Sequence, residues 1–449
     1  MNRVLSLAIG AALLGAHSPT PSTGSAANHG RPGDAVVLEW NAVAVQAVGA
    51  SAPFPSTRAM AITQLAVFEA VNAITRRYTP YLGPLSAPDA ASPDAAAVVA
   101  AHDALVWLFP GQQAFLDGKQ AESLAAIPNG PAKDAGVAVG RSAAAAVIAI
   151  RTGDGSAPPQ FHTPADDAPY EWQPTPSCAS APANNRGLFL HWPLVKPFGV
   201  KSSAQFRAPR PPALTSARSR AYRREASAGD LAEVSAVGDT NSTERPPDRA
   251  DVAKLFAAQP PHRGWNLVAR QLASARHDDI TKTARTLAVM NMALSDVHIT
   301  VFESKYFYRT WRPETAIRRA DEDGNPRTTS NPDYTPFVVT PCFPGYPSAH
   351  GAGGGAARVV LERAYGRRGH TLTITDAGAP GIELHYSNLR DITDDVSDAR
   401  VFGGIHFRFD QDAGNEMGED VGRYDDQHLL RRSHHEHDED CDEDEDDGE

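Results

Sequence analysis

The residues whose types and spacing best suit chemistry lie in the stretch TPCFPGYPSAHG, residues 340–351. Ser348 directly follows a proline there, and His350 stands two positions later. The three prolines of this stretch oppose a helix before Ser348, and the Ala-rich sequence after it favours one. Ser348 is therefore expected to cap a helix. The free N–H groups and positive dipole end of that helix would form a site for a tetrahedral oxyanion, with His350 in its first turn.

A segment upstream supplies two cations. Pro313 is expected to end a helix at about Arg312, because the residue before a proline disfavours helical backbone. Seven helical residues at roughly 100° each bring Arg312 back to within about 20° of Lys305. The sequence therefore predicts that both cations share one helix face.

A segment downstream supplies a third cation and a second histidine. Arg400 precedes His406, and Asp410 follows His406 by four residues. On a helix this spacing is one turn, so Asp410 would be close enough to hold the imidazole through its other nitrogen. Three cations, a hydroxyl, a helix N-terminus and two histidines are thus expected to converge on one oxyanion.

These three segments together resemble a known signature. The patterns K-x6-RP, PSxH and R-x5-H-x3-D, in that order, are similar to the motif shared by vanadium-dependent haloperoxidases and type-2 phosphatidic acid phosphatases. The resemblance to the haloperoxidase branch extends to WNAVAVQAV near Trp40, RAMAITQLAVFEAVNAI and TLAVMNMALSDVHITVFESKYFYRTWRPETAIR. It covers most of residues 36–425 and is looser from about 155 to 260.

The resemblance implies a vanadate cofactor. The residues that would hold it are Lys305, Arg312, Ser348, Ala349, Arg400 and His406. His406 would donate a nitrogen lone pair to the vanadium, and Asp410 would fix its tautomer. His350 would stand opposite as acid and base. By the same resemblance Phe343 and Phe302 would line a halide pocket.

Two chemistries remain open. In a vanadium-dependent haloperoxidase, vanadate-bound peroxide oxidises a halide to hypohalous acid, with Lys305 polarising the peroxide and a small organic acceptor taking the halogen. In a secreted acid phosphatase on the same scaffold, His406 would form a phosphohistidine intermediate and His350 would protonate the leaving alcohol. A third hypothesis is an oxyanion-binding protein without catalysis, which the retained histidines His350 and His406 disfavour.

Ordinary roles are the alternative for each residue taken alone. A lone Lys or Arg on a helix is usually a solvated charge, Ser348 could be only a cap, and His406 with Asp410 could be a surface pair. Order, spacing and resemblance together favour the site. Two positions depart from the family pattern: Ala349 replaces a glycine and crowds the anion, and Ala399 replaces a residue that is often serine.

Charge and apolar runs exclude some classes of protein. The formal net charge is −12, and the segment from residue 433 carries eleven Asp and Glu without Lys or Arg. The rest is therefore nearly neutral, which argues against a nucleic-acid surface, and the acidic tail is expected to be disordered. Residues 1–27 read as a signal peptide of a secreted or periplasmic protein, and no later stretch suits an integral membrane protein. A bridge between Cys178 and Cys342 is one option in an oxidising compartment.

The elements that must position the site predict an all-α fold of two helical bundles, with the site inside the C-terminal bundle. Expected helices are 34–48, about 58–77, 95–109 with Asp94 as cap, 135–151, 214–236, 248–257, 281–312, 349–366 and roughly 395–424. Short strand pairs are expected within 321–341 or at 371–375. The predicted parts are a signal peptide (1–27), an N-terminal bundle (28–153), a Pro-rich irregular covering segment (154–262), a catalytic bundle (263–432) and a tail (433–449).

Overall fold

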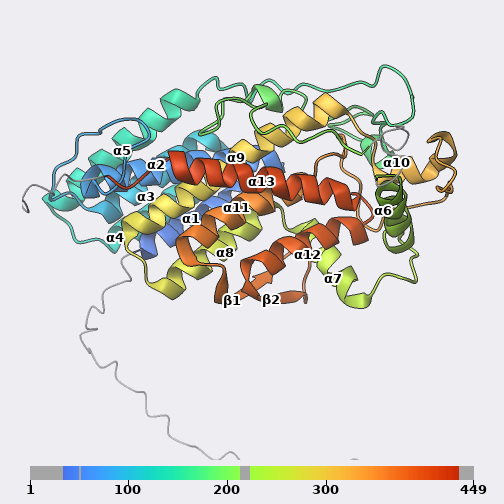
Figure 1. Ribbon diagram of the computed structural model, residues 1–449. Helices are drawn as coiled ribbons and strands as arrows, with labels where there is room; N and C mark the ends of the chain where they lie inside the picture. The colour runs from blue at the N-terminus through green and yellow to red at the C-terminus, as the bar shows by residue number, and fades with distance from the viewer. Residues whose placement is uncertain (1–33, 50–51, 213–222, 434–449) are drawn as a thin grey trace, which may run out of the picture. The chain divides into compact units, whose positions relative to one another are not determined.

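The fold is almost entirely helical, as the sequence predicted. The computed structural model describes residues 34–49, 52–212 and 223–433 (Figure 1). Within these ranges it contains a single β-sheet, which has two strands. The predicted signal peptide and residues 434–449 of the predicted tail lie outside the described residues. Among the helices within these ranges, none is both long and apolar enough to cross a membrane.

Five helices occupy the N-terminal part, where four were expected. They are α1 (Ala35–Val48), α2 (Pro53–Thr75), α3 (Pro93–Leu108), α4 (Gln113–Ala125) and α5 (Pro131–Arg151). The missed helix, α4, buries only Leu116 and Ser123, so its sequence carries little apolar periodicity. The cap of α3 is Ser92, whose hydroxyl accepts from the Ala95 N–H at 3.2 Å, and not Asp94, which stands in the first turn.

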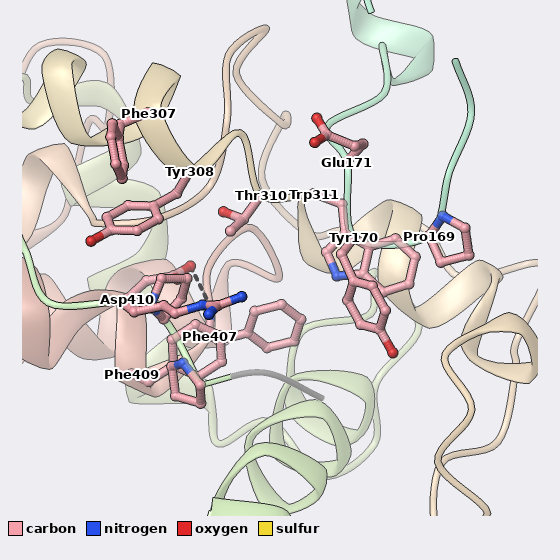
Figure 2. Close-up of a pocket in the computed structure, with 13 residues that line it drawn as sticks. Pro169, Tyr170, Glu171, Phe307, Tyr308, Thr310, Trp311, Phe407, Phe409 and Asp410 are labelled. Carbon is pink, nitrogen blue, oxygen red and sulfur yellow. Dashed lines mark hydrogen bonds between the residues drawn. The ribbon is translucent and has the colours of Figure 1, made fainter. Parts of the chain in front are cut away.

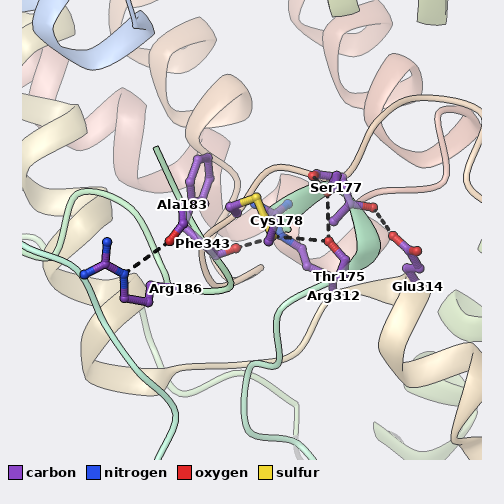
Figure 3. The surroundings of a disulfide bond; sticks show 10 residues. Thr175, Ser177, Cys178, Ala183, Arg186, Arg312, Glu314 and Phe343 are labelled. Atoms are coloured by element: carbon purple, nitrogen blue, oxygen red, sulfur yellow. Dashed lines mark hydrogen bonds between the residues drawn. A yellow bond between two sulfur atoms is a disulfide. The ribbon is translucent and has the colours of Figure 1, made fainter. Parts of the chain in front are cut away.

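The irregular segment that follows is fixed to the rest of the chain at several points. From 152 to 212 it contains only short 3-10 turns, and then come α6 (Arg223–Val237) and α7 (Pro247–Ala258). A disulfide joins Cys178 to Cys342, with their Cα atoms 5.4 Å apart, and Figure 3 shows it near Phe343 and Arg312. The Ser177 hydroxyl donates to the Thr340 carbonyl at 2.6 Å. The segment therefore supports the loop that precedes Ser348.

The C-terminal part holds the remaining helices and the strand pair. These are α8 (Pro261–Arg276), α9 (Ile280–Tyr308), α10 (Pro313–Arg318), α11 (Ala349–Tyr365), α12 (Leu389–Phe402) and α13 (Arg408–His428), with β1 (Arg368–Thr375) antiparallel to β2 (Glu383–Asn388). Strand β1 includes the stretch 371–375, where a strand was expected. Residues 321–341 contain no strand pair of their own, because they run as turns after α10.

Helix α9 joins the two halves of the fold. It packs against α2 of the N-terminal part and against α11 and α13 of the C-terminal part. Because it is covered on nearly every side, most of its residues from Thr281 to Lys305 are buried. A helix buried all round shows no single apolar stripe, in agreement with the mixed sequence of this stretch.

Small residues bring α11 and α13 into close contact. A Cβ added at Gly418 would lie 2.1 Å from the Ala352 carbonyl oxygen, and one at Gly414 would lie 2.5 Å from that of Ser348. On the facing helix, a Cβ at Gly355 would lie 2.5 Å from the Asn415 carbonyl oxygen. The glycines of both helices therefore allow close helix packing, and this packing holds the starts of α11 and α13 together.

Candidate active site

Lys305 and Arg312 converge, but not in the way that the sequence suggested. Helix α9 ends at Tyr308, where Arg309 adopts a left-handed conformation (φ 49°), so Arg312 lies in an extended loop and shares no helix face with Lys305. The prediction of a helix up to Arg312 was wrong because this turn stops α9 four residues before the proline can act.

One loop holds both cations in place. The Lys305 Nζ donates to the carbonyls of Pro344 at 2.8 Å and Gly345 at 2.6 Å, and the Arg312 Nε donates to the Phe343 carbonyl at 2.9 Å. The Phe343 ring centroid is 5.3 Å from the Lys305 Nζ and 5.0 Å from the Arg312 guanidinium carbon. Both distances permit a cation–π attraction. The residues between Pro341 and Ser348 thus position the cations as well as the helix start.

Ser348 caps α11 as predicted. Its hydroxyl oxygen accepts from the Gly351 N–H at 3.2 Å, and its own N–H donates to the Asp410 carbonyl at 2.9 Å. The second of these bonds ties the start of α11 to the first turn of α13. The hydroxyl proton of Ser348 is not consumed by the cap, so it stays available to donate to an anion.

His406 and Asp410 meet at a helix start and not along one helix. The single helix expected at 395–424 is divided into α12 and α13 at Gly403 and Gly404, and Gly404 has a φ of 78°. His406 lies in the resulting link. Asp410 stands in the first turn of α13, where its Oδ2 accepts from the Phe407 N–H at 3.1 Å and lies 2.8 Å from the His406 Nδ1.

The partners of His406 fix its tautomer. The Nε2 of His406 lies 2.9 Å from the Nη1 of Arg312, and a guanidinium can only donate. The Nε2 is therefore the acceptor, and the proton sits on Nδ1, where it is donated to Asp410. This tautomer turns the free lone pair of Nε2 toward the cations, as a bond to a central vanadium or phosphorus atom would require.

The cationic side chains of the site carry more N–H donors than the surrounding residues have acceptors for. The Nη2 of Arg312 and the Nε of Arg400 are buried without a hydrogen-bond partner in the described part of the chain. The Nη1 of Arg400 reaches only the Phe256 carbonyl, at 3.4 Å. Leaving a buried donor unpaired costs about 1–3 kcal/mol, more for a charged group. The donor set therefore fits a small anion with several oxygens, such as vanadate or phosphate.

Burial and crowding shift the pKa values of these groups. Burial lowers the pKa of Lys305 well below its ordinary value, and Arg312 adds to this effect. Burial also lowers the pKa of Arg312 to about 9 and that of Arg400 to about 10. Burial raises the pKa of Asp410 to about 7. A bound anion would favour the charged form of each cation.

The two histidines are kept neutral. Burial lowers the pKa of His406 well below its usual range, and Arg312 contributes to the shift. Burial also lowers the pKa of His350 well below its usual range, and among the charged groups Arg400 contributes most to the shift. Neutral imidazoles can accept a proton or donate a lone pair, which are the two functions expected of these residues.

Comparisons with known proteins agree with this geometry. Residues 285–434 match the family model described as the VCPO second helical-bundle domain. The vanadium chloroperoxidase of Curvularia inaequalis is 23% identical over 241 residues, which are 39% of this chain and 38% of that relative. The C-terminal third of the chain is thus similar to the second helical-bundle domain of vanadium chloroperoxidases.

Solved structures of vanadium haloperoxidases share the fold. A bacterial vanadium-dependent iodoperoxidase is 23% identical, with a TM-score of 0.75 over 89% of this chain and 97% of that one. A bacterial vanadium-dependent chloroperoxidase in its holo form is 18% identical, with a TM-score of 0.65 over 90% of this chain and 94% of that one. These likenesses concern the fold alone, and the chain matches well under half the length of the curated fungal relative.

A cavity of about 990 Å³ opens in front of the candidate site. Its wall includes Ala349, His350, Arg400 and His406. Phe343 also lines it, whereas Phe302 is fully buried and packs behind Phe343 with their ring centroids 5.2 Å apart. The predicted aromatic pair thus lies beside the site, with one ring on the cavity wall and the other supporting it.

Sequence reasoning missed several residues of this wall. Phe54 of α2 and Phe189 and Trp192 of the irregular segment line the cavity. They lie at least 150 residues from Phe343 in the sequence, and no local pattern distinguishes them from other core aromatics. Only the tertiary packing identifies them.

A buried histidine behind the start of α11 was also missed. The Nε2 of His298 lies 3.3 Å from the Ala349 carbonyl oxygen, and its Nδ1 lies 3.3 Å from the Thr57 hydroxyl. Burial lowers the pKa of His298 to about 4, so it stays neutral and supports the first turn of α11. The one indication of it in the sequence was that His298 lies in the stretch around α9 that resembles the haloperoxidases.

A second cavity, of about 580 Å³, lies on the other side of Asp410. Figure 2 shows the aromatic rings of Tyr170, Trp311, Phe407 and Phe409 around it. Lys305, Arg312, His350, Arg400 and His406 do not line it. Of the predicted residues, His350, Arg400 and His406 therefore face the first cavity, and Asp410 lines the second.

Proposed function

We propose that this protein is a vanadium-dependent haloperoxidase that uses hydrogen peroxide to oxidise a halide to hypohalous acid. The observation that carries the proposal is the lone pair of the His406 Nε2, which faces buried cations with unpaired donors. The match of residues 285–434 to the VCPO second helical-bundle domain, and the similarity to a vanadium chloroperoxidase, support it.

The residues present fit vanadate as a cofactor. Lys305, Arg312 and Arg400 would balance its negative charge, and the Ser348 hydroxyl and the N–H groups at the start of α11 would add hydrogen bonds. His406 would hold it through Nε2. When bound, vanadate would supply the Lewis acidity that polarises hydrogen peroxide for attack by a halide.

His350 is the residue suited to moving protons. It lines the cavity, and its lowered pKa leaves an imidazole nitrogen free to accept a proton from incoming hydrogen peroxide. The imidazolium formed in this way would be acidic, since the nearby arginines disfavour it, and would return the proton to the departing oxygen. Asp410 would keep His406 in its tautomer throughout.

A phosphatase acting at the same site is the second candidate. The observation that favours it is again the unprotonated Nε2 of His406 beside the buried cations, whose lone pair could attack the phosphorus of a phosphomonoester. The negative charge of the bound phosphate would favour the protonated form of His350, whose proton the departing alcohol would take. The water that then releases phosphate from His406 would return a proton to His350. The donor set that fits vanadate fits phosphate equally well.

One experiment separates the two candidates. Purified protein is loaded with orthovanadate and assayed for bromination of a phenol dye with bromide and hydrogen peroxide, and the vanadate-free protein is assayed for hydrolysis of p-nitrophenyl phosphate. We expect bromination that requires vanadate and disappears in His406→Ala, while His385→Ala, which removes an exposed histidine of β2, retains it. Hydrolysis without bromination would establish the phosphatase instead.

We also infer that the protein works outside the cytoplasm. The Cys178–Cys342 bond supports an oxidising compartment, where such bridges persist. The signal-like composition of residues 1–27 supports export. N-terminal sequencing of the protein from culture medium or periplasm is expected to begin near Asn28, and a full-length protein confined to the cytoplasm would contradict export.

A further inference from the structure

We propose that the cavity in front of His406 binds the organic substrate itself, an apolar aromatic molecule, and that halogenation takes place inside the cavity. This inference rests on the proposed haloperoxidase function. It differs from a reaction in which hypohalous acid leaves the protein and halogenates whatever it meets in solution.

The size of the cavity exceeds what peroxide and halide need. Its volume is about 990 Å³. One water molecule occupies about 30 Å³ of liquid, and hydrogen peroxide or a halide ion is of similar scale. Pockets of roughly 300–1,000 Å³ are those that hold drug-sized ligands. The cavity is therefore large enough for an organic molecule beside the small reactants.

The wall of the cavity is divided into a charged end and an aromatic remainder. Arg400 gives the charged end its charge, and the neutral imidazoles of His350 and His406 lie on the wall there. Beside them, the rings of Phe54 and Phe343 meet edge to face at 5.7 Å. A molecule with an apolar aromatic body would pack on such rings while its reactive carbon faces the charged end.

Further aromatic groups extend this wall. The Phe189 ring lies 5.1 Å from that of Phe54 and 6.0 Å from that of Trp192, in both cases edge to face. Two polar side chains of the same wall are already engaged: the His191 Nδ1 accepts from the Gln160 N–H at 3.1 Å, and the Lys254 Nζ pairs with Asp251 at 3.3 Å. Recognition along this part of the wall would therefore depend mainly on apolar contact.

The cavity is accessible from solvent. Val339, which lines it, is 74% exposed, and Ala257 near the end of α7 is also exposed. Exposed apolar residues beside a cavity are typical of a site that admits an apolar ligand. The substrate would enter past these residues and reach the charged end without crossing the core.

The chemical step balances with the reactants already named. Hydrogen peroxide, a halide ion and a proton give hypohalous acid and water. The ring carbon of the substrate then forms a bond to the halogen, the halogen–oxygen bond breaks, and the proton of that carbon leaves with the hydroxide as water. An electron-rich ring such as a phenol or naphthol has the required nucleophilicity.

Binding can be tested without vanadate. The neutral naphthalene dye 6-propionyl-2-(dimethylamino)naphthalene is titrated into vanadate-free protein, and its fluorescence is followed. We expect saturable binding that Ala257→Trp weakens at least tenfold, because the indole would occupy the cavity. Ala145→Trp, an equal change at an exposed position of α5 away from the cavity, is expected to bind as the wild type does. Absent binding, or binding that Ala257→Trp leaves unchanged, would overturn the proposal.

Substrate selection tests the chemistry. Vanadate-loaded protein brominates an equimolar mixture of 2-naphthol and phenol-4-sulfonate, and reagent hypobromite brominates the same mixture. The ratio of brominated 2-naphthol to brominated phenol-4-sulfonate is expected to be at least fivefold higher with the enzyme than with hypobromite. Ala257→Trp is expected to lower this ratio to that of the reagent. Equal ratios would show that the halogenating agent acts in solution and would overturn the proposal. Dye binding that Ala257→Trp weakens in a protein without bromination would support the binding cavity and contradict the proposed function.

Discussion

At the scale of single residues, the account depends on the direction of one lone pair. Asp410 holds the Nδ1 proton of His406, and Arg312 faces the Nε2. In the other tautomer the Nε2–H of His406 would point at the Arg312 guanidinium, which has no lone pair to accept it. The Nδ1 would then carry no proton to donate to Asp410. The residues around His406 therefore hold its imidazole in the orientation that the proposed oxyanion binding requires.

The partnership of His406 and Asp410 leads to a first prediction. In Asp410→Asn the carboxylate is lost, and the amide no longer favours the proton on Nδ1. Orthovanadate binding is expected to weaken about 10–100-fold, the usual effect of removing the outer partner of a ligating histidine. Equilibrium dialysis measures it. Asp412→Asn, an exposed position two residues further along α13, is the matched control and should bind normally.

The lowered pKa of Lys305 leads to a second prediction. Because burial and Arg312 depress its pKa, Lys305 loses its proton at a lower pH than an ordinary lysine does, and a bound anion raises the pKa again. Binding of sulfate, which does not titrate in this range, should therefore take up protons and weaken as the pH rises. Calorimetry in two buffers of different ionisation enthalpy measures the uptake. Lys305→Met should reduce it, and binding without proton exchange would contradict the assignment.

At the scale of elements, the sequence predicted which candidate residues lie close together better than it predicted the helices and loops that carry them. The prolines before Ser348 and the alanines after it correctly located the start of α11, because both signals are local. The ends of α9 and α12 were missed. Arg309 turns left-handed without being a glycine, and Gly403 and Gly404 interrupt what reads as a continuous helical pattern. Those ends are decided by packing against other segments.

The partner of Arg312 illustrates the same limit. Two of its hydrogen bonds go to the backbone carbonyls of Phe343 and Ile405. Every residue type has a backbone carbonyl, so the sequence does not indicate which of them Arg312 contacts. The sequence could name Arg312, Lys305 and His406 as one set because their types and order match a family. It could not show that a single loop holds the cations, since that arrangement depends on tertiary contacts.

The contact between α11 and α13 leads to a third prediction. A Cβ at Gly418 would lie 2.1 Å from a backbone oxygen of Ala352, so Gly418→Ala must separate the two helices. We expect a loss of about 1–3 kcal/mol in the free energy of unfolding, the usual cost of overpacking, and weaker orthovanadate binding. Gly118→Ala in α4, where an added Cβ meets nothing within 4 Å, should be neutral or slightly stabilising in the same denaturant titration.

At the scale of the whole molecule, distant parts of the chain meet around α9. The Asp296 carboxylate accepts from the N–H groups of Phe198, Gly199 and Val200 at 2.6–3.0 Å, which fixes the irregular segment to this helix. Asp425 of α13 is buried nearby, and neither of its oxygens has a hydrogen-bond partner among the described residues. These contacts help to hold the irregular segment, which contributes to the cavity wall, against α9.

This buried carboxylate pair leads to a fourth prediction. Burial raises the pKa of Asp296 to about 6, and burial with the neighbouring Asp296 raises that of Asp425 further above its ordinary value. Groups with a raised pKa favour the native state at low pH and oppose it as the pH rises above the unfolded value near 4. Asp425→Asn should therefore melt higher than the wild type at pH 8, with little difference at pH 4.

The neighbouring residue provides the contrast for this prediction. Asp426 pairs with Arg285 at 3.1 Å and also with Arg363. Asp426→Asn should melt lower than the wild type at pH 8, because it removes attractive pairs. If both variants melted lower by similar amounts, Asp425 would be a stabilising charge, and the account of the buried pair would be wrong.

The central claim is that three segments far apart in the sequence close around one oxyanion. A crystal structure of the protein soaked with orthovanadate tests it most directly. The account predicts a tetrahedral or five-coordinate anion with vanadium bonded to the His406 Nε2 and oxygens within hydrogen-bonding distance of the Arg312 Nη2 and the Arg400 Nε. An anion bound elsewhere, or a His406 that bonds nothing at saturating orthovanadate, would contradict it.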